Sequence, residues 1–443
     1  MTDLEMEFAR RTVRSREIHE RSKDLIPMEV IGTVDMPYPI YLAEGHGARV
    51  IDVDGNEYID LSMGFGCHVL GHAHPSVVGA VQDAATRGVQ FGIHTPHQEP
   101  LARLVVEACP CAESVLFCNS GTEATMYAIR LARAHSGKTK IGFFEGAYHG
   151  AHDIAVFKTD DSSARNRPQP TSKGAGVPAA TLEEILLLPY RDESAFDLIR
   201  QYADELAVVV IEPVQGSNPT LQCEEFLAEL VEVAKQCGVL LLFDEVITGF
   251  RLSLGGAQSQ FKLTPDLATY GKTVGGGLPI GAVAGRADVM ARFNWHKHKD
   301  IEGQVFAGGT FGGNPLSMCA GAATVEYLRD HPEVYTHLAR HGERFEEELG
   351  QFCEDKELPV QVMTAHSMIH LRFQDGPVKT TRDVDRSLAR AEKEFYTRLL
   401  LEGILVPGDH LALTSAMHTS ADIDKVLQAM YQSLEDNQSL AHH

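Results

Sequence analysis

Two uninterrupted apolar runs near the middle of the chain constrain its fold more than any other feature. AVVVIEP (207–213) and GVLLLFDEV (238–246) each have the pattern of a strand that is buried on both faces. Between them, LQCEEFLAELVEVAKQCG (221–238) has apolar residues at helical spacing and a glycine where the helix would stop. Such strand–helix–strand units predict an α/β fold with a mainly parallel central sheet flanked by helices.

Each of these two runs meets an acidic residue near its end, Glu212 in the first and Asp244 in the second. In open parallel sheets, ligands bind at the carboxyl ends of the strands. A carboxylate at the end of a buried strand is costly unless it is paired, so we expect Asp244 to meet a cationic group. The two acids therefore indicate where chemistry takes place.

The ends of the chain differ from this central block. YLAEGHGARVIDVDGNEYIDL (41–61) alternates around DGN as a hairpin does, SMIHLRF (367–373) reads as a strand, and a final helix is expected after TSADID (419–424). We predict a smaller α+β domain built from both chain ends beside one large domain. The predicted ranges are 1–69 for the N-terminal segment, 70–325 for the large domain and 326–443 for the C-terminal part.

The stretch 158–184 is polar, long, and rich in proline and glycine. A loop of that length in a compact domain is usually a lid or a disordered segment. We therefore expect one of these two behaviours here.

Composition excludes several classes of partner. The chain has 443 residues, of which 44% are hydrophobic, and a formal net charge of −22, which argues against nucleic acids and anionic membranes. The sequence has no run of 18 apolar residues, and its charged start lacks the apolar core of a secretory signal, so we expect a cytoplasmic protein.

Neither the cysteines nor the histidines predict a metal site. The eight cysteines are scattered and read as reduced thiols of the core. One group of histidines matches none of the usual ligand spacings, and we interpret its members as structural: His68, His72, His74, His94 and His97.

A strand end, a turn and a helix are predicted at FCNSGTEATMYAIRLARAHSG (117–137), where Ser120 and Glu123 match the capping-box pattern. This pattern has two readings. The turn can simply cap a helix. Alternatively, free N–H groups, the helix dipole and two hydroxyls, those of Ser120 and Thr122, can form a cradle for a phosphate around Gly121.

Two further segments carry reactive or aromatic groups between glycines. TYGKTVGGGLPIGA (269–282) places Lys272 between a glycine and a run of three glycines, which suggests that something needs room beside its amine. In EGAYHG (145–150), the flanking glycines would let a flat ligand approach Tyr148 and His149. A Tyr-His pair is also common in purely structural roles.

Together these features meet the requirements of pyridoxal 5′-phosphate (PLP). Its phosphate needs N–H donors, its ring needs a stacking face, its pyridine nitrogen needs a carboxylate, and its aldehyde needs a lysine amine for a Schiff base. A nicotinamide cofactor is not indicated, because no G-x-G-x-x-G opens a helix after a strand.

The sequence resembles the class III aminotransferases of fold type I, and within them the glutamate-1-semialdehyde aminomutases. The resemblance begins near residue 45 and rests on motifs in this order: DVDGNEYID, GHAHP, NSGTEATMYAIRLAR, FEGAYHG, IEPVQG, LLFDEVITGFR, PDLATYGKTVGGGLPIGA and GTFGGNPLSMCAG.

The resemblance implies roles for individual residues. Lys272 would bond to the cofactor aldehyde and Asp244 would pair with the pyridine nitrogen. Val246 and Tyr148 would cover the two faces of the ring, and Glu212 would support the catalytic site from its strand end. The remaining implied contacts are Ser120, Gly121 and Thr122 to the phosphate, His149 and Ser217 near the cofactor, and Thr310 to the phosphate of the neighbouring subunit in a homodimer.

The family resemblance implies a ping-pong transfer of an amino group between a small-molecule amine donor and a carbonyl acceptor. The substrate segments depart from the aminomutase pattern, since IPMEVIGTVDMPYPIY (26–41) has no arginine and VPGDHLALTS (406–415) lacks the usual glutamate. This favours an aminotransferase acting on an amine or a non-α amino compound with an acceptor such as a 2-oxo acid. The alternative is glutamate-1-semialdehyde 2,1-aminomutase. A carboxylate could still be held by Arg49, Arg251 or His410.

Overall fold

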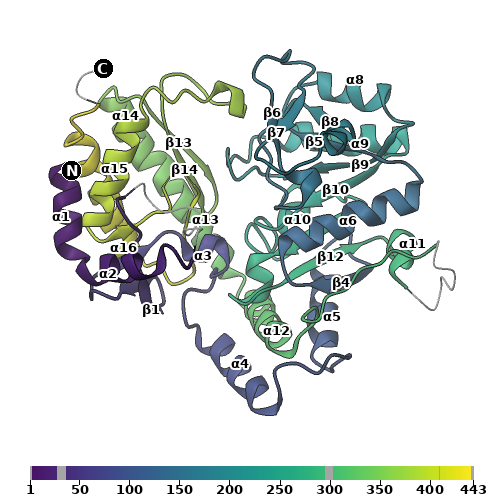
Figure 1. Cartoon of the computed structure of the whole chain (residues 1–443), viewed down its shortest axis with the longest axis horizontal. Helices are drawn as coiled ribbons and strands as arrows, with labels where there is room; N and C mark the ends of the chain where they lie inside the picture. Colours follow the sequence, from purple (N-terminus) through teal and green to yellow (C-terminus); the bar gives the residue numbers. More distant parts are fainter. Residues whose placement is uncertain (1, 27–35, 295–302, 409, 441–443) are drawn as a thin grey trace. The chain divides into compact units, whose positions relative to one another are not determined.

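The computed structural model describes residues 2–26, 36–294, 303–408 and 410–440 and separates into two compact units (Figure 1). The first unit combines Met1–His74, Thr336–Val378 and Asp383–His443, and the second combines Pro75–Tyr335 with the short segment Lys379–Arg382. Both ends of the chain thus belong to one unit. The domain boundaries proposed from the sequence lie between residues 69 and 70 and between 325 and 326. The boundaries between the compact units lie between residues 74 and 75 and between 335 and 336.

The second unit is built on a seven-stranded sheet in which only β12 runs against its neighbours. The α/β fold with a mainly parallel sheet, expected from the apolar runs, is confirmed. From one edge to the other the strands are β4 (Ser114–Cys118), β12 (Gly281–Gly285), β11 (Leu267–Gly271), β10 (Leu240–Asp244), β9 (Leu206–Ile211), β5 (Lys140–Phe144) and β8 (Ile185–Leu188).

The local pattern explains the central strand–helix–strand unit. Every residue of β9 and of β10 is buried, as expected of strands covered on both faces. The helix between them, α9 (Glu224–Cys237), ends at Gly238, which has the left-handed φ of 61° that a glycine adopts at low cost. The end of the helix agrees with the sequence pattern.

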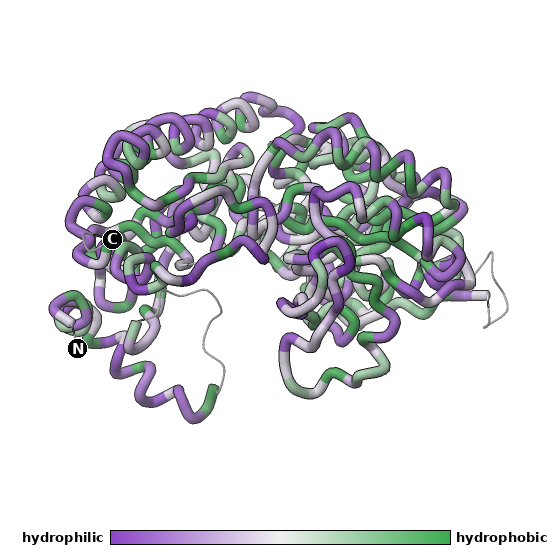
Figure 2. The backbone as a smooth tube through the Cα atoms, turned by 90° about the horizontal axis from the view of Figure 1, so that it is seen from above, coloured by the Kyte–Doolittle hydropathy of each residue, from purple (hydrophilic) through white to green (hydrophobic). Residues whose placement is uncertain are grey.

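Helices cover this sheet, and the strands are more hydrophobic than the helices. Figure 2 shows hydrophobic residues gathered along the strands, whereas the helices alternate between hydrophobic and hydrophilic positions. Helix α6 packs against β9, β11 and β12 through small buried residues such as Ala124 and Ala128. The helices of the unit are α4 (Pro75–Arg87), α5 (Gln98–Ala108), α6 (Gly121–Ser136), α7 (Ala179–Glu183), α8 (Ser194–Gln201), α9, α10 (Gly256–Phe261), α11 (Ala287–Met290) and α12 (Pro315–Asp330).

The polar stretch 158–184 has regular structure. Strands β6 (Phe157–Thr159) and β7 (Pro170–Ser172) pair as an antiparallel hairpin, and helix α7 follows. The turn between the two strands is organised by Ser163, whose hydroxyl donates to the Asp160 carbonyl and accepts from the Gln169 amide. The segment is therefore an ordered hairpin followed by a helix, and its behaviour as a lid stays a prediction.

The first unit has an α+β architecture with two small sheets. The predicted hairpin is confirmed as β2 (Arg49–Asp52) and β3 (Glu57–Asp60), which pair antiparallel. The predicted strand at 367–373 is confirmed as β14 (Met368–Phe373). The remaining strands are β1 (Leu42–His46) and β15 (Ile404–Leu405) in the first sheet, and β13 (Val360–Ala365) and β16 (Ala412–Leu413) in the second.

The helices of the first unit lie at both ends of the chain. The final helix begins at Ser420, because Thr419 and Asp422 form a capping box there. The helices are α1 (Asp3–Arg11), α2 (Val13–Ser22), α3 (Met63–Gly66), α13 (Glu333–Arg344), α14 (Gly350–Asp355), α15 (Ala389–Leu401) and α16 (Ser420–Glu435). Over the described residues, no helix combines the length and apolarity needed to cross a bilayer.

Candidate active site

The predicted site residues follow strands whose carboxyl ends share one edge of the seven-stranded sheet. Asp244 is the last residue of β10, Glu212 follows β9, and Lys272 follows β11. The antiparallel strand β12 joins β11 to β4, because its first residue, Gly281, pairs with Gly271 on one side and with Cys118 on the other. The turn before α6 is thereby brought to the same edge as Lys272.

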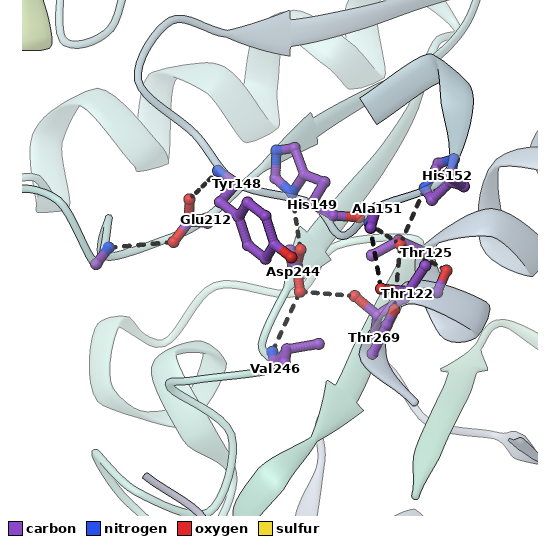
Figure 3. A network of polar contacts seen from close by, with 12 residues as sticks. Thr122, Thr125, Tyr148, His149, Ala151, His152, Glu212, Asp244, Val246 and Thr269 are labelled. Carbon is purple, nitrogen blue, oxygen red and sulfur yellow. Dashed lines mark hydrogen bonds and ion pairs between the residues drawn. The ribbon is translucent and has the colours of Figure 1, made fainter. Parts of the chain in front are cut away.

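Asp244 is buried and accepts three hydrogen bonds (Figure 3). One carboxylate oxygen lies 2.7 Å from Nδ1 of His149. The other oxygen accepts from the Thr269 hydroxyl at 3.0 Å and from the Val246 amide at 3.2 Å. The expected cationic partner is thus a histidine, which is cationic only when protonated, and the carboxylate is held in a fixed orientation.

His149 connects Asp244 to the helix turn. Its ring stacks on Phe143 with 5.2 Å between centroids, and its backbone carbonyl accepts from the Thr125 hydroxyl at 2.7 Å. The same hydroxyl lies 3.2 Å from Nε2 of His152. The side chain of His149 is fully buried, so its ring cannot turn freely and holds Asp244 in place.

Glu212 fixes the backbone that carries Tyr148. Its two carboxylate oxygens accept from the amides of Tyr148 at 2.8 Å and of Gly216 at 3.1 Å. Burial raises the pKa of the Glu212 carboxyl above its ordinary value. Tyr148 as a whole residue is 58% exposed, so its side chain is accessible for a contact outside the chain.

The turn before α6 serves both as a helix cap and as a set of free donors. The Ser120 hydroxyl accepts from the Glu123 amide at 3.1 Å. The Glu123 carboxylate bonds the Asn119 amide at 2.8 Å, one residue before the position that a capping box would use. Across the described part of the chain, no acceptor binds the amides of Gly121 and Thr122. The prediction that this turn caps the helix is confirmed. The prediction that it binds a phosphate stays a prediction, and the two amides without an acceptor are compatible with it.

Val246 occupies the space that two glycines leave. A Cβ on Gly121 would lie 2.9 Å from Val246 Cγ1, and a Cβ on Gly271 would lie 3.3 Å from the same atom. These glycines therefore bring the helix turn, the end of β11 and the turn after β10 into contact.

Lys272 stands in a strained position with its amine unengaged. Its φ of 49° is in the left-handed region, which a non-glycine residue seldom adopts and which often marks functional sites. The residue is half-buried and, among the described residues, its side-chain amine has no hydrogen bond or ion pair. A half-buried amine without a partner fits a lysine that is reserved for a covalent bond.

The glycines after Lys272 have an intramolecular reason. A Cβ on Gly275 would collide with Ile280, and a Cβ on Gly276 would approach the Ala320 carbonyl of α12. The run therefore lets the turn pack closely against α12, and the sequence-based idea that it makes room beside the amine stays a prediction.

The other predicted residues lie in different surroundings. Ser217 donates to the Gly146 carbonyl at 3.2 Å, next to the turn of Tyr148. Thr310 is exposed, and its carbonyl accepts from the side-chain amide of Gln90. The arginine-free stretch 26–41 falls largely on 27–35, outside the described residues.

The three candidate partners for a substrate carboxylate are not equivalent. Arg49 is engaged by Asp422 at 2.7 Å and by Glu57 at 3.2 Å. Arg251 is fully buried, whereas His410 is exposed with its ring 6.0 Å from that of Phe65. Arg49 is therefore already neutralised within its own unit.

Three contributors to this site were not predicted: Thr269, Thr125 and Glu145. Thr269 could have been found, because it is a polar residue in the apolar strand LATYG and pairs in register with Asp244. Nothing local distinguishes Thr125 or Glu145, since their partners come from other elements.

The residues of this edge fit PLP. Two free amides and the hydroxyls of Ser120 and Thr122 suit a phosphate, and the buried carboxylate of Asp244 suits a protonated ring nitrogen. The unengaged amine of Lys272 suits an aldehyde.

Comparison with known proteins agrees with this chemistry. The model of the class-III aminotransferase family matches residues 31–434. A glutamate-1-semialdehyde 2,1-aminomutase of Methanothermobacter thermautotrophicus is 37% identical over 428 residues, which cover 95% of this chain and 99% of the relative.

Two solved structures are similar over nearly their whole length. An omega-transaminase from Sphaerobacter thermophilus has a TM-score of 0.90 and 32% identity, covering 96% of this chain and 98% of the other. A transaminase with PLP bound has a TM-score of 0.87 and 31% identity, covering 97% and 99%. The chain therefore belongs to the class-III aminotransferases, and it is a PLP-dependent enzyme of fold type I.

Proposed function

We propose that the enzyme is an aminotransferase that moves an amino group from an amine or a non-α amino compound to a carbonyl acceptor such as a 2-oxo acid, by a ping-pong mechanism. The observation that carries this proposal concerns charge. The sequence lacks an arginine at 26–41, and the nearby Arg49 is already engaged by Asp422 and Glu57. Without a firm grip on a substrate carboxylate, a bound intermediate escapes, and a separate acceptor is required.

The proposed residue roles follow the geometry of the edge. The Gly121 and Thr122 amides, with the Ser120 hydroxyl, would hold the phosphate. Asp244 would hold the ring nitrogen, and the ring would lie between Val246 and Tyr148. Bound PLP supplies an electron sink that allows a C–H bond of the amine to break.

Lys272 would move the proton between the substrate carbon and the cofactor, because its amine has no other partner among the described residues. Glu212 would act as a positioning residue, since both its oxygens bind backbone amides. His149 would hold Asp244, and Ser217 would hold the turn of Tyr148 through Gly146.

The alternative function is that of glutamate-1-semialdehyde 2,1-aminomutase. The names of relatives such as that of Methanothermobacter favour it, at 37% identity. An aminomutase returns the amino group to the same molecule, so it needs no external acceptor. The two functions therefore differ in one measurable requirement.

The test compares two incubations of the PLP-loaded enzyme. One contains an amine donor and a 2-oxo acid, and the other contains glutamate 1-semialdehyde alone, with the enzyme first converted to its aminated form. We expect amine-dependent bleaching of the visible cofactor band and turnover only with the acceptor. Efficient formation of 5-aminolevulinate without an acceptor would establish the aminomutase instead.

We also propose a homodimer with shared catalytic sites. Two neighbouring stretches of the second unit expose large apolar side chains, and the bond from Gln90 to the Thr310 carbonyl joins these stretches. The exposed side chains are Val89, Phe91, Ile93, Phe306 and Phe311, with exposed fractions between 53% and 78%. An apolar patch of this kind is typical of an interface, so Thr310 would reach the phosphate of the partner subunit.

We place the enzyme in the cytoplasm, where its eight free cysteines would stay reduced.

A further inference from the structure

Arg382 forms a buried link between two segments of the second unit. It belongs to the short segment Lys379–Arg382, which packs with that unit although its sequence neighbours do not. Its Nε donates to the Glu145 carboxylate at 2.8 Å, and its two Nη atoms donate to the carbonyl and the hydroxyl of Ser163 at 2.8 and 3.0 Å. The side chains of Arg382 and Glu145 are only 6% and 3% exposed.

Glu145 opens the turn that carries Tyr148 and His149. It follows the last residue of β5, and its backbone carbonyl accepts from the side-chain amide of Gln215 at 3.0 Å. The next residue, Gly146, has a φ of 79°, and a Cβ there would meet Thr381 at 2.6 Å. The segment that carries Arg382 therefore packs directly on this turn.

Ser163 is the centre of the turn between β6 and β7. Its hydroxyl bonds both the Asp160 carbonyl and the Gln169 amide, so a group that binds Ser163 fixes the whole turn. The hairpin also ends close to Tyr148, since the ammonium of Lys173 lies 5.7 Å from the centroid of the Tyr148 ring.

We propose that Arg382 is a positioning residue that locks the β6–β7 hairpin to the Tyr148 turn. The inference rests on the proposed function in so far as Tyr148 is taken to face the cofactor. The link needs the geometry of the guanidinium as well as its positive charge. The Nε atom binds Glu145, while the two Nη atoms of the same planar group bind Ser163. A lysine ammonium could pair with Glu145 but could not span both partners.

The link also determines the charge at this edge of the sheet. Three buried acids follow three adjacent strands: Glu145 after β5, Glu212 after β9 and Asp244 at the end of β10. Arg382 neutralises the first of them. Removing it takes this cation away from the buried Glu145 carboxylate, so a variant without the cation is destabilised for a reason unrelated to the hairpin.

The experiment separates these two effects with PLP-loaded protein. Arg382→Lys keeps the charge, and Arg382→Gln combined with Glu145→Gln removes both partners of the ion pair. In both variants we expect the amides of the hairpin turn, residues 160–169, to exchange hydrogen about tenfold faster, the factor for one or two lost hydrogen bonds. The control is Arg167→Gln, on the same turn, whose guanidinium bonds only the Tyr202 hydroxyl among the described residues.

Kinetics provide a second readout. The KM for the amine donor should rise on the order of tenfold in Arg382→Lys, because a displaced hairpin loosens the contacts around Tyr148. The kcat should change less than about threefold, since Lys272 and Asp244 stay in place. Cofactor content, measured by absorbance, should stay equal to that of the Arg167→Gln control.

Unchanged hydrogen exchange at 160–169 in Arg382→Lys would overturn the proposal, whatever the activity. Faster exchange that reaches all peptides of the unit equally would overturn it too, because it would show a general loss of stability. Hydrogen exchange does not depend on the reaction, so a failure of the proposed function alone would leave a localised increase at 160–169 intact.

Discussion

At the scale of single residues, the carboxylate of Asp244 is held by three donors, of which His149 is the only one that can carry a positive charge. We predict that Asp244→Asn lowers the rate of amine-dependent bleaching about a hundredfold, because a neutral amide no longer keeps the ring nitrogen protonated. Stopped-flow absorbance measures this rate. Thr269→Ala serves as the control, because it removes one donor and keeps the charge. An equal loss in both variants would contradict the charge argument.

The amine of Lys272 is predicted to carry the covalent link to the cofactor. Lys272→Ala should lose turnover while it keeps its fold and some PLP, because the phosphate contacts around Gly121 and Thr122 remain. Reduction with borohydride followed by mass spectrometry should find the cofactor mass on the wild type and on Lys235→Ala, an exposed helix control. Labelling of Lys272→Ala at another lysine would show that the assignment is wrong.

At the scale of one element, the first turn of α6 has two functions that share one hydroxyl. Ser120 accepts from the Glu123 amide and can still donate its own hydrogen to an anion. We predict that Ser120→Ala costs about 1 kcal/mol of stability without PLP, the usual effect of losing a cap. It should also weaken PLP binding, as measured by titration.

The matched control for this prediction is Ser136→Ala at the other end of the same helix, where the hydroxyl bonds the Ala132 carbonyl. This change should leave PLP binding as it is in the wild type. If both variants bind PLP equally well, the hydroxyl of Ser120 does not contact the phosphate.

At the scale of the whole molecule, buried histidines make stability depend on pH. Burial lowers the pKa of His418 to about 4 and that of His341 to about 3. Both are neutral in the folded state and would bind a proton near pH 6.5 when unfolded. Their contribution to the free energy of unfolding is therefore fully present above about pH 6.5. It is lost as the pH falls toward 4, by roughly 1.4 kcal/mol per pH unit for each histidine.

Urea unfolding of the first unit between pH 7 and pH 5 measures this effect. His418→Asn should reduce the slope of unfolding free energy against pH by about 1.4 kcal/mol per pH unit, the effect of one proton. His46→Asn, at an exposed position, should leave the slope unchanged. An unchanged slope in His418→Asn would mean that this histidine is charged in the folded protein.

The proposed homodimer gives a further prediction at this scale. Ile93→Ser combined with Phe311→Ser removes two side chains that are 78% and 60% exposed, so the chain itself should remain folded. We expect a monomer in sedimentation and a loss of PLP, because Thr310 would no longer reach a partner. Val106→Ser, at a 38% exposed position on α5, is the control. A double variant that remains a dimer would show that the interface lies elsewhere.

Local patterns in the sequence were sufficient to predict the elements and the chemical groups of the site. The strands β9 and β10, the helix between them and the cap at Ser120 all follow from patterns that span fewer than about 20 residues, and Lys272 is marked by the glycines around it. Such patterns report burial and backbone preference, which each segment shows on its own. The groups that a PLP site requires can therefore be recognised in the sequence alone.

The pairs of side chains that meet became known only from the packing of the elements. His149 binds Asp244 across 95 residues of sequence, and Arg382 binds Glu145 across 237. These pairs depend on the order of strands in the sheet and on the path of the segment Lys379–Arg382, and no periodicity in one sequence encodes either. The physical reason is that a local pattern specifies which face of an element is buried, whereas a contact between elements exists only once their packing has placed two specific side chains within about 3 Å of each other.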